Sequence, residues 1–297
     1  MSSTTVHPTT VLHERRLLFE SSDISVVDFR CTEHGTQDGP EEPNPTHSIA
    51  FIRRGVFRRT VQGRRLVADA SHVLFFNASE LYQYAHPIPG GDDCTILTVS
   101  TPVALELVAR HAPRHAEQPE RPFCLGHGLT SPRTARLHYE LLALVRQSAS
   151  RLALEDVLAD LADEAVRAAF ARDATPGEDD PLPALAQRRR RDLVEAAKLA
   201  INERLESPPS LRTLAHTLGC SPFHLSRTFH RTEGLSLRRY VGRLRARIAA
   251  HHLANGAPDL TELALHLGYT DHSHFTNAFH REWGHPPSQF RARHRRR

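Results

Sequence analysis

The feature that most constrains the fold is a repeat in the last third of the chain, where residues 211–240 and 260–290 share one pattern. The first matches recur at an offset of 49, and after one inserted residue the others follow at an offset of 50. The matched pairs are Leu211/Leu260, Leu214/Leu263, Ala215/Ala264, Leu218/Leu267, Gly219/Gly268, Leu225/Phe275, Phe229/Phe279, His230/His280, Arg231/Arg281, Gly234/Gly284 and Tyr240/Phe290. Composition does not produce so many matches at one period, so the same supersecondary unit is expected twice.

Each copy has the local signals of a helix, a tight turn and a second helix. The first helix follows a capping residue and ends at a glycine, which tolerates the left-handed conformation that closes a helix. A new cap then starts the second helix. These three positions are Ser210, Gly219 and Ser221 in the first copy, and Asp259, Gly268 and Asp271 in the second. Residues 237–253 are expected to join the copies as one long helix. The pattern therefore predicts two helix-turn-helix units.

The second helix of each copy has an apolar and a polar face. Leu225 and Phe229, like Phe275 and Phe279, are spaced to point into a core. The opposite face carries the candidate DNA-binding residues, which are Phe223, Ser226, Arg227 and His230 in the first copy and His272, Ser273, Thr276 and Asn277 in the second. An outward arginine suits bidentate contact with guanine, and an outward asparagine suits adenine. Ordinary solvated side chains are the alternative interpretation of this face.

The charge distribution favours a polyanion as the partner of the repeated segment. The chain has a net charge of +4, but residues 187–297 carry +11 and the preceding residues carry −7. Lys198 is the only lysine, so the basic surface is expected to consist of arginine. A basic module joined to an acidic one is typical of a nucleic-acid-binding domain attached to a second domain. A charge difference that serves solubility alone is the alternative.

Residues 187–291 resemble the DNA-binding domain of the AraC/XylS family of bacterial regulators. The resemblance rests on the Leu-Ala-x-x-Leu-Gly helices, residues 221–229, Gly234 to Tyr240, residues 268–279 and Gly284 to Arg291. It implies that two recognition helices enter successive major grooves on one face of a bent duplex. Carried over by the motif, the base-facing positions are Phe223, Ser226, Arg227, His272, Ser273, Thr276 and Asn277. The chain departs from a strict repeat where Asn277 replaces Arg227, so the two helices are not expected to read the same bases. RNA polymerase is a further candidate partner of such a regulator.

The N-terminal part is expected to be a second domain of a different class. Short runs rich in Val, Ile, Phe and Thr between residues 24 and 100, separated by turn residues, predict strands. This segment is similar to small cupin barrels, which implies a sensor for a small-molecule effector. No ligand-binding residue is assigned. Phe75, Phe76, Tyr82 and Tyr84 either line a cavity or fill the core. The fold class is therefore α+β with two domains, a cupin-like barrel followed by helices and an all-α double helix-turn-helix domain.

Two leucine-rich helices are expected over residues 132–172, and residues 173–183 are acidic and proline-rich. The leucine stripes exceed what one edge of a barrel needs, which suggests a homodimer interface. The expected division is a sensor domain at 1–130, a dimerisation segment at 131–173, a linker at 174–186 and the DNA-binding domain at 187–297. A fragment from about residue 183 to the C-terminus is expected to fold alone, with a core that does not depend on the β-rich segment.

A metal site is an alternative use of the N-terminal domain. Cys31, His34, His47 and His86 could converge, with Cys94 on a later strand. The complete cupin pattern of two nearby histidines, a glutamate and a later histidine is absent, so no metal, cofactor or catalytic residue is assigned.

Four scattered cysteines without a CxxC pair, no apolar run long enough to span a membrane and no signal pattern indicate a cytoplasmic protein. The rival functions are a cupin-type oxygenase or DNA-repair alkyltransferase fused to this module, and an architectural DNA binder without ligand. The dispersed cysteines do not form the cluster that such a repair enzyme needs.

Overall fold

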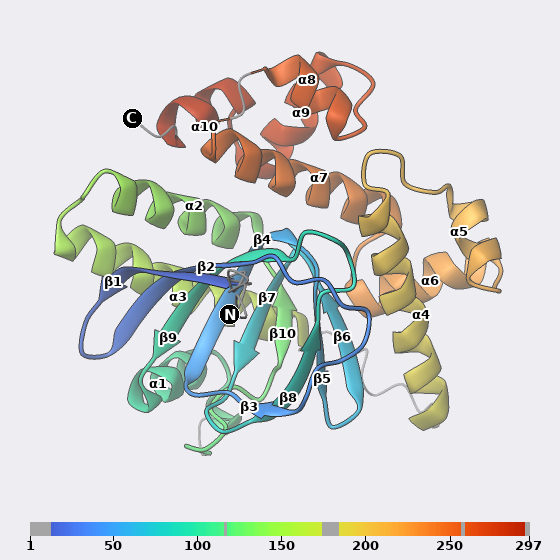
Figure 1. Ribbon diagram of the computed structural model, residues 1–297. Helices are drawn as coiled ribbons and strands as arrows, with labels where there is room; N and C mark the ends of the chain where they lie inside the picture. Colours follow the sequence, from blue (N-terminus) through green and yellow to red (C-terminus); the bar gives the residue numbers. More distant parts are fainter. Residues whose placement is uncertain (1–12, 116–117, 174–183, 257–258, 295–297) are drawn as a thin grey trace, which may run out of the picture.

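A computed structural model describes residues 13–115, 118–173, 184–256 and 259–294 (Figure 1). The N-terminal part consists of two sheets, ordered β1-β2-β9-β4-β7-β10 and β3-β8-β5-β6. The strands are β1 (His13–Glu20), β2 (Ile24–Cys31), β3 (Glu42–Pro43), β4 (His47–Gly55), β5 (Phe57–Val61), β6 (Arg64–Ala68), β7 (His72–Phe76), β8 (Leu81–Ala85), β9 (Asp92–Val99) and β10 (His127–Leu129).

Strand β4 shows why the larger sheet lies at the centre of this part. Alternate side chains point to opposite faces of a strand. Ile49 and Phe51 face the helices that cover the sheet, whereas Ala50 and Ile52 face the second sheet. All four side chains are buried, so β4 reads as an uninterrupted apolar run. The prediction of a β-rich segment followed by helices is confirmed.

Strand β1 and helix α1 are among the elements that lie outside the segments that the pattern marked. Strand β1 precedes residue 24, and helix α1 (Thr101–His111) follows the last strand of the segment. The sequence HERRLLFE of β1 is mostly exposed, because the strand lies at the edge of its sheet, so it lacks a continuous apolar signal. Helix α1 buries Ala104, Leu107 and Val108 against the same core as the sheet.

The leucine stripes of α2 (Pro132–Arg146) and α3 (Arg151–Asp173) are used within the chain. Leu141 together with Leu154, Leu158 and Leu161 belongs to the core beneath the larger sheet. The other face of α2 packs against the C-terminal helices through Ala135, Tyr139 and Leu142. Much of these stripes is therefore buried within the chain, and the homodimer interface stays a prediction.

In the described residues of the C-terminal part, all regular secondary structure is helical. Its helices are α4 (Ala184–Glu203), α5 (Leu211–Thr217), α6 (Pro222–Glu233), α7 (Leu237–Ala254), α8 (Leu260–His266), α9 (His272–Trp283) and α10 (Pro287–His294). The pair α5–α6 lies beyond one end of α7, whereas the pair α8–α9 lies above it (Figure 1). Residues 174–183 of the expected linker lie outside the described residues. Helix α4 begins at Ala184, so it includes the last three positions of the expected linker, 184–186. Within the described part, every helix is too short or too polar to cross a bilayer.

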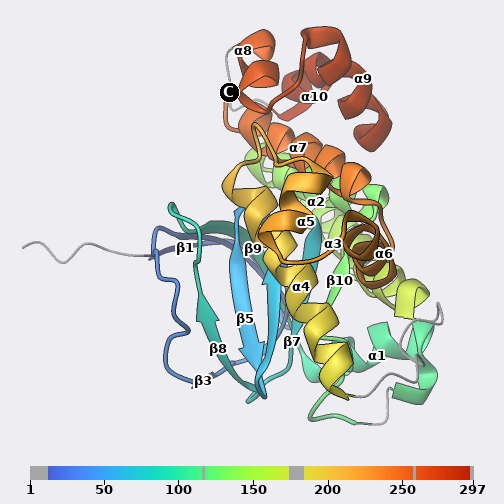
Figure 2. The ribbon, with the colours of Figure 1, turned by 90° about the vertical axis from the view of Figure 1, so that its right-hand side faces the viewer.

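The two parts share their cores, contrary to the expectation of independent ones. Helix α7 lies above α2, and α4 runs along the flank of β5 and β6 (Figures 1 and 2). Tyr139 of α2 contacts Trp283 and Phe290 of the second helix-turn-helix unit, with ring centroids 5.2 and 5.3 Å apart. Ala70, next to β6, belongs to the core of the first unit. The sequence pattern missed this because inward-facing residues do not reveal which domain they face.

Candidate DNA-binding surface and its contacts with the N-terminal domain

Helix α6 is fixed at both ends by the residues that the repeat marked. The Ser221 hydroxyl accepts a hydrogen bond from the His224 backbone N–H at 3.1 Å, and Gly234 ends the helix with a φ of 63°. Leu225 and Phe229 are fully buried against α4, α5 and α7. The predicted caps and the inward face of this helix are confirmed.

The opposite face of α6 carries the candidate DNA-binding residues of the first unit. Arg227 and His230 are exposed, and Ser226 is half-buried. Phe223 is 74% exposed, which is unusual for a large aromatic side chain. This face therefore presents a guanidinium, an imidazole and an apolar ring on one helix, groups that suit contact with base edges and thymine methyl groups.

Helix α9 has the same construction in the second unit. Asp271 caps it by accepting from the His274 N–H at 2.8 Å, and Gly284 ends it with a φ of 78°. The exposed face includes His272, Ser273 and Asn277. Thr276 is half-buried, and its hydroxyl oxygen is buried without a hydrogen-bond partner among the described residues. Thr276 is thus the least accessible of the four positions.

Three further side chains on these faces were missed. His224 and His274 are exposed in the first turn of α6 and α9, and His280 is exposed one turn after Thr276. The repeat offset of 50 pairs His280 with His230, so the sequence contained a signal for it. Arg243, by contrast, is only 11% exposed and lies 3.2 Å from Glu282, so it is bound within the protein.

Helix α7 holds the second unit in place. The indole N–H of Trp283 donates to the Ala246 carbonyl at 3.0 Å, and Arg245 donates to the Glu206 carbonyl at 3.0 Å. At Gly268 the backbone has a φ of 74°, and a Cβ there would lie 1.7 Å from the Glu206 carbonyl oxygen. Glycine is therefore required at this turn by both its conformation and its neighbour.

The turn between β6 and β7 inserts into the first unit. Asp69 accepts hydrogen bonds from the Tyr240 hydroxyl of α7 and from Asn202 of α4, the latter at 2.8 Å. His72 lies 3.1 Å from Asp69 through Nδ1 and 3.7 Å from Glu233 through Nε2. Glu233 is the last residue of α6, so the N-terminal domain directly contacts a candidate recognition helix.

Burial and pairing have opposite effects on these groups. Burial alone would raise the pKa of Asp69, but His72 and the hydrogen bonds from Tyr240 and Asn202 lower it to about 2. Burial and Lys198 oppose protonation of His72, yet Asp69 and Glu233 raise its pKa above the ordinary value. Lys198 is itself buried, 2.9 Å from Glu195 and 3.3 Å from Glu233. The turn is thus held by a buried network of charges.

Arg247 forms a second link between the domains. Its guanidinium donates to the carbonyls of Ala70 and Thr130 at 3.2 and 2.9 Å, and it pairs with Glu282 at 2.8 Å. Glu282 lies on α9. The Ala70 and Thr130 carbonyls belong to the N-terminal domain, so Arg247 connects that domain to both α7 and α9, the second candidate recognition helix.

A cavity of about 510 Å³ opens where the domains meet. Its walls come from β1, β2, β4, α2 and the C-terminal end of α7. The ionisable side chains that line it are Arg16, Asp28, Arg30, Arg53, Arg146 and His251. Four arginines against one aspartate give it an excess of positive charge. Asp28 is paired with Arg53 and lies 3.7 Å from Arg30.

Phe75, Phe76, Tyr82 and Tyr84, the candidates for a cavity lining, each pack against a neighbouring aromatic ring. Phe75 lies against Phe123, Phe76 contacts Tyr82 at 5.5 Å, and Tyr84 lies 6.1 Å from Tyr82. The Arg59 guanidinium lies 4.2 Å above the Phe76 ring. These contacts favour the core-filling interpretation, and the interdomain cavity described above has other walls.

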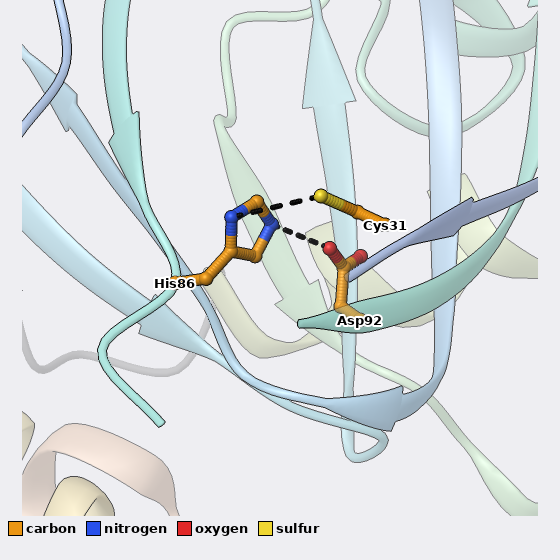
Figure 3. Close-up of side chains that lie close together, drawn as sticks. All are labelled: Cys31, His86 and Asp92. Atoms are coloured by element: carbon orange, nitrogen blue, oxygen red, sulfur yellow. Dashed lines mark hydrogen bonds and ion pairs between the residues drawn. The ribbon is translucent and has the colours of Figure 1, made fainter. Parts of the chain in front are cut away.

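The candidate metal ligands converge only in part. Cys31 and His86 come together with Asp92, which was not among the candidates (Figure 3). His34 is exposed and lies outside this cluster, and His47 instead accepts from the Ala78 N–H at 3.1 Å. Burial raises the pKa of the Cys31 thiol to about 11, so the thiol stays protonated near neutral pH.

Several known proteins are similar to this chain or to its C-terminal part. Residues 214–293 match a family model described as a helix-turn-helix domain. The chain is 25% identical over 264 residues to the HTH-type transcriptional activator RhaS of Escherichia fergusonii. This match covers 85% of this chain and 87% of RhaS. The regulatory protein SoxS of Salmonella typhimurium is 29% identical over 93 residues, covering 31% of this chain and 87% of SoxS. Apo ToxT from Vibrio cholerae, a solved structure, covers 92% of this chain and 98% of its own at 12% identity and a TM-score of 0.38.

Proposed function

Because the chain belongs to the AraC family of DNA-binding transcription regulators, we propose that α6 and α9 read two successive major grooves of one DNA site. The observation that carries this proposal is the pair of exposed faces, each on a capped helix with a buried apolar side. Arg227 and Asn277 occupy equivalent positions of the repeat. Their different hydrogen-bonding chemistry predicts an asymmetric site, with guanine favoured by one and adenine by the other.

Control by a small-molecule effector is the second part of the proposal. The candidate DNA-binding side chains other than Ser226 and Thr276 are exposed while the domains are docked, so the N-terminal domain does not cover them. Asp69, His72 and Arg247 instead connect the N-terminal domain to α6, α7 and α9. We infer that an effector acts by changing the relative positions of α6 and α9. The relatives named as transcriptional activators favour activation as the outcome.

The interdomain cavity is the place where a bound effector would change the relative positions of α6 and α9. It is bounded by the sensor strands and by α7, and its arginines suit a small anion. A ligand there contacts both domains, so its binding energy depends on how they are docked. Exposed Arg16 lines the cavity, whereas exposed Arg64 on β6 does not.

The experiment adds inorganic phosphate and short carboxylates to the full-length chain and follows its melting temperature and its DNA affinity. An anion that changes both should lose its effect in Arg16→Glu and keep it in Arg64→Glu. An equal response of the two variants would show that the anion binds elsewhere. DNA binding by both variants without any anion tests the DNA-reading proposal separately.

The remaining expectations stay proposals. The division at 1–130, 131–173, 174–186 and 187–297 describes functional segments, although the first two and the last are packed together. A homodimer that uses α2 and α3 stays a proposal, and RNA polymerase stays a candidate partner. The four cysteines form no disulfide within the described part of the chain, which supports a reducing cytosol as the place of action.

A further inference from the structure

Both candidate recognition helices carry a histidine at the same position of their first turn. His224 of α6 and His274 of α9 are separated by the repeat offset of 50. Each lies three residues after its helix cap, Ser221 or Asp271, and each is exposed. An exposed, titratable ring therefore recurs beside both reading faces, outside the candidate base-facing residues.

The His274 ring is held in one orientation although it is exposed. Its Nδ1 lies 3.2 Å from the Thr270 hydroxyl oxygen. The ring also lies edge-on to Tyr269, with centroids 5.3 Å apart and planes at 88°. Tyr269 is buried, and the Arg245 guanidinium lies 5.6 Å from its ring centroid. Among the described residues, no side-chain hydrogen bond or ring contact orients His224, so the second copy differs from the first in presenting a fixed imidazole.

The hydrogen bonds around Thr270 determine which nitrogen of His274 carries a proton. The Thr270 hydroxyl donates its single proton to the Asp271 carboxylate at 3.1 Å. The His274 backbone N–H and this hydroxyl lower the pKa of Asp271, so the carboxylate is ionised near neutral pH and can only accept. The Thr270 oxygen must then accept from Nδ1 of His274. The second proton of the charged ring resides on Nε2, which has no partner in the described part of the chain.

The place of His274 on α9 favours a phosphate over a base as its partner. Successive residues of an α-helix are about 100° apart round the axis, so His274 lies about 60° from exposed Asn277 and about 100° from buried Phe275. It therefore lies at the border of the reading face, next to the core side of the helix. A helix in the major groove has the sugar–phosphate backbones along its sides, and contacts to phosphates position a protein on DNA.

We propose that His274 anchors α9 to the DNA backbone: its Nε2–H donates to a phosphate oxygen, and the ring takes up one proton from solvent when the complex forms. This inference rests on the proposed function, since it requires α9 to lie in a major groove. A phosphate beside the ring favours the charged form, because the two charges are opposite. Thr270 is a positioning residue, which holds the ring and keeps a proton on Nδ1.

The neighbours of the imidazole in the protein are compatible with this proton uptake. The Asp271 carboxylate interacts electrostatically with His274, which favours the charged ring. Burial raises the pKa of Tyr269 to about 12, so this neighbour is neutral. The Arg245 guanidinium of α7 lies against Tyr269. The charged ring is thus stabilised by one carboxylate in the free protein and additionally by a phosphate in the complex.

The test compares the DNA affinity of the full-length chain and its variants at pH 6.0 and 8.5, on the preferred site and on random DNA. His274→Ala should lower the affinity at pH 6.0 about tenfold on both DNAs, the effect of one hydrogen bond to a charged group, and less at pH 8.5. It should also reduce the slope of log K against log salt concentration by about 1.

Two further variants separate the charge of the ring from a structural role. His274→Lys keeps a cation at both pH values, so it should retain the affinity and reduce its dependence on pH. His34→Ala removes an exposed histidine of the N-terminal domain and should leave DNA binding unchanged. A loss for His274→Ala that is the same at both pH values, or that occurs on the preferred site alone, would overturn the phosphate contact.

A double-mutant cycle tests the role of Thr270. Thr270→Val should lower the affinity at pH 6.0 about threefold in the wild-type chain and have no effect in the His274→Ala background. An equal loss in both backgrounds would contradict a role that acts through His274.

Asn277→Ala distinguishes failure of this inference from failure of the proposed function. If Asn277→Ala alters the sequence preference while His274→Ala has no effect, α9 reads DNA and the phosphate contact alone is refuted. If neither variant changes DNA binding, the proposed function of α9 fails together with this inference.

Discussion

The hydroxyl of Tyr240 on α7 donates a hydrogen bond to the carboxylate of Asp69, which lies 171 positions earlier, in the turn between β6 and β7. Both side chains are fully buried. Asp69 also holds His72 and Asn202, so this bond belongs to the network that joins the N-terminal domain to α4, α6 and α7. The DNA-binding domain is consequently attached to the sensor by specific polar contacts as well as by apolar packing.

Tyr240→Phe should therefore destabilise the docked chain by about 1–3 kcal/mol, because a buried carboxylate loses one of its donors. Chemical unfolding of the full-length protein measures the loss. Tyr269→Phe is a matched control in the same domain, since its hydroxyl is buried without a hydrogen-bond partner in the described part of the chain. Equal losses in the two variants would contradict a specific role for the Tyr240–Asp69 bond.

The same network predicts a dependence of stability on pH. The pKa of His72 is raised in the folded chain, so its contribution is complete below the ordinary value of 6.5 and disappears as the pH rises through the raised value. The pKa of Asp69 is lowered to about 2, so its contribution is complete above the ordinary value of 3.8 and is lost as the pH falls toward 2. The network should thus be strongest between about pH 4 and 6.5.

The stability lost in His72→Gln should accordingly be larger at pH 5.5 than at pH 9. Glu233, Lys198, His127 and Tyr240 surround His72 in both the wild-type protein and the variant. Comparing the two proteins at each pH therefore removes most of the contribution of these neighbours. A difference in unfolding free energy that is the same at both pH values would mean that folding does not raise the pKa of His72.

The turn of the second unit gives a steric prediction. Gly268→Ala should destabilise the protein by more than about 1 kcal/mol, because its φ is positive and a Cβ would collide with the Glu206 carbonyl. Gly242→Ala, within α7, has nothing within 4 Å of the added Cβ and should stabilise by about 0.5–1 kcal/mol. Thermal unfolding of both variants shows whether the two substitutions have opposite signs.

The sequence predicted those parts of the fold that depend on neighbours along the chain. Ser210, Gly219, Asp259 and Gly268 act as expected, since a cap or a left-handed turn is set by the few residues beside it. The docking of Asp69 onto Tyr240 could not be predicted, because no local pattern marks a partner so distant. The cluster of Cys31, His86 and Asp92 was half foreseen: Cys31 and His86 were candidates for it, but strand register, unknown from sequence, brings in Asp92.

The reading of DNA by α6 predicts different effects for two exposed arginines. Arg227→Ala should cost about 1–3 kcal/mol at the preferred site and relax the preference at one base pair. Arg239→Ala, in the first turn of α7, should weaken binding to all sequences alike if that residue contacts phosphate. Gel-shift titrations on the preferred site and on random DNA separate the two effects. An equal loss on both DNAs for Arg227→Ala would remove it from the base-reading residues.

The tandem arrangement of α6 and α9 is tested most directly by selecting binding sites for the full-length chain from a random-sequence DNA library. The selected sequences are then footprinted. Two rigidly connected readers predict two different sequence elements in fixed order, their centres about 34 Å or one helical turn apart, within about 20 protected base pairs. Replacing Arg227 should alter one element, and replacing Asn277 should alter the other. Selection of a single short palindromic element, or of no preferred sequence at all, would contradict the account.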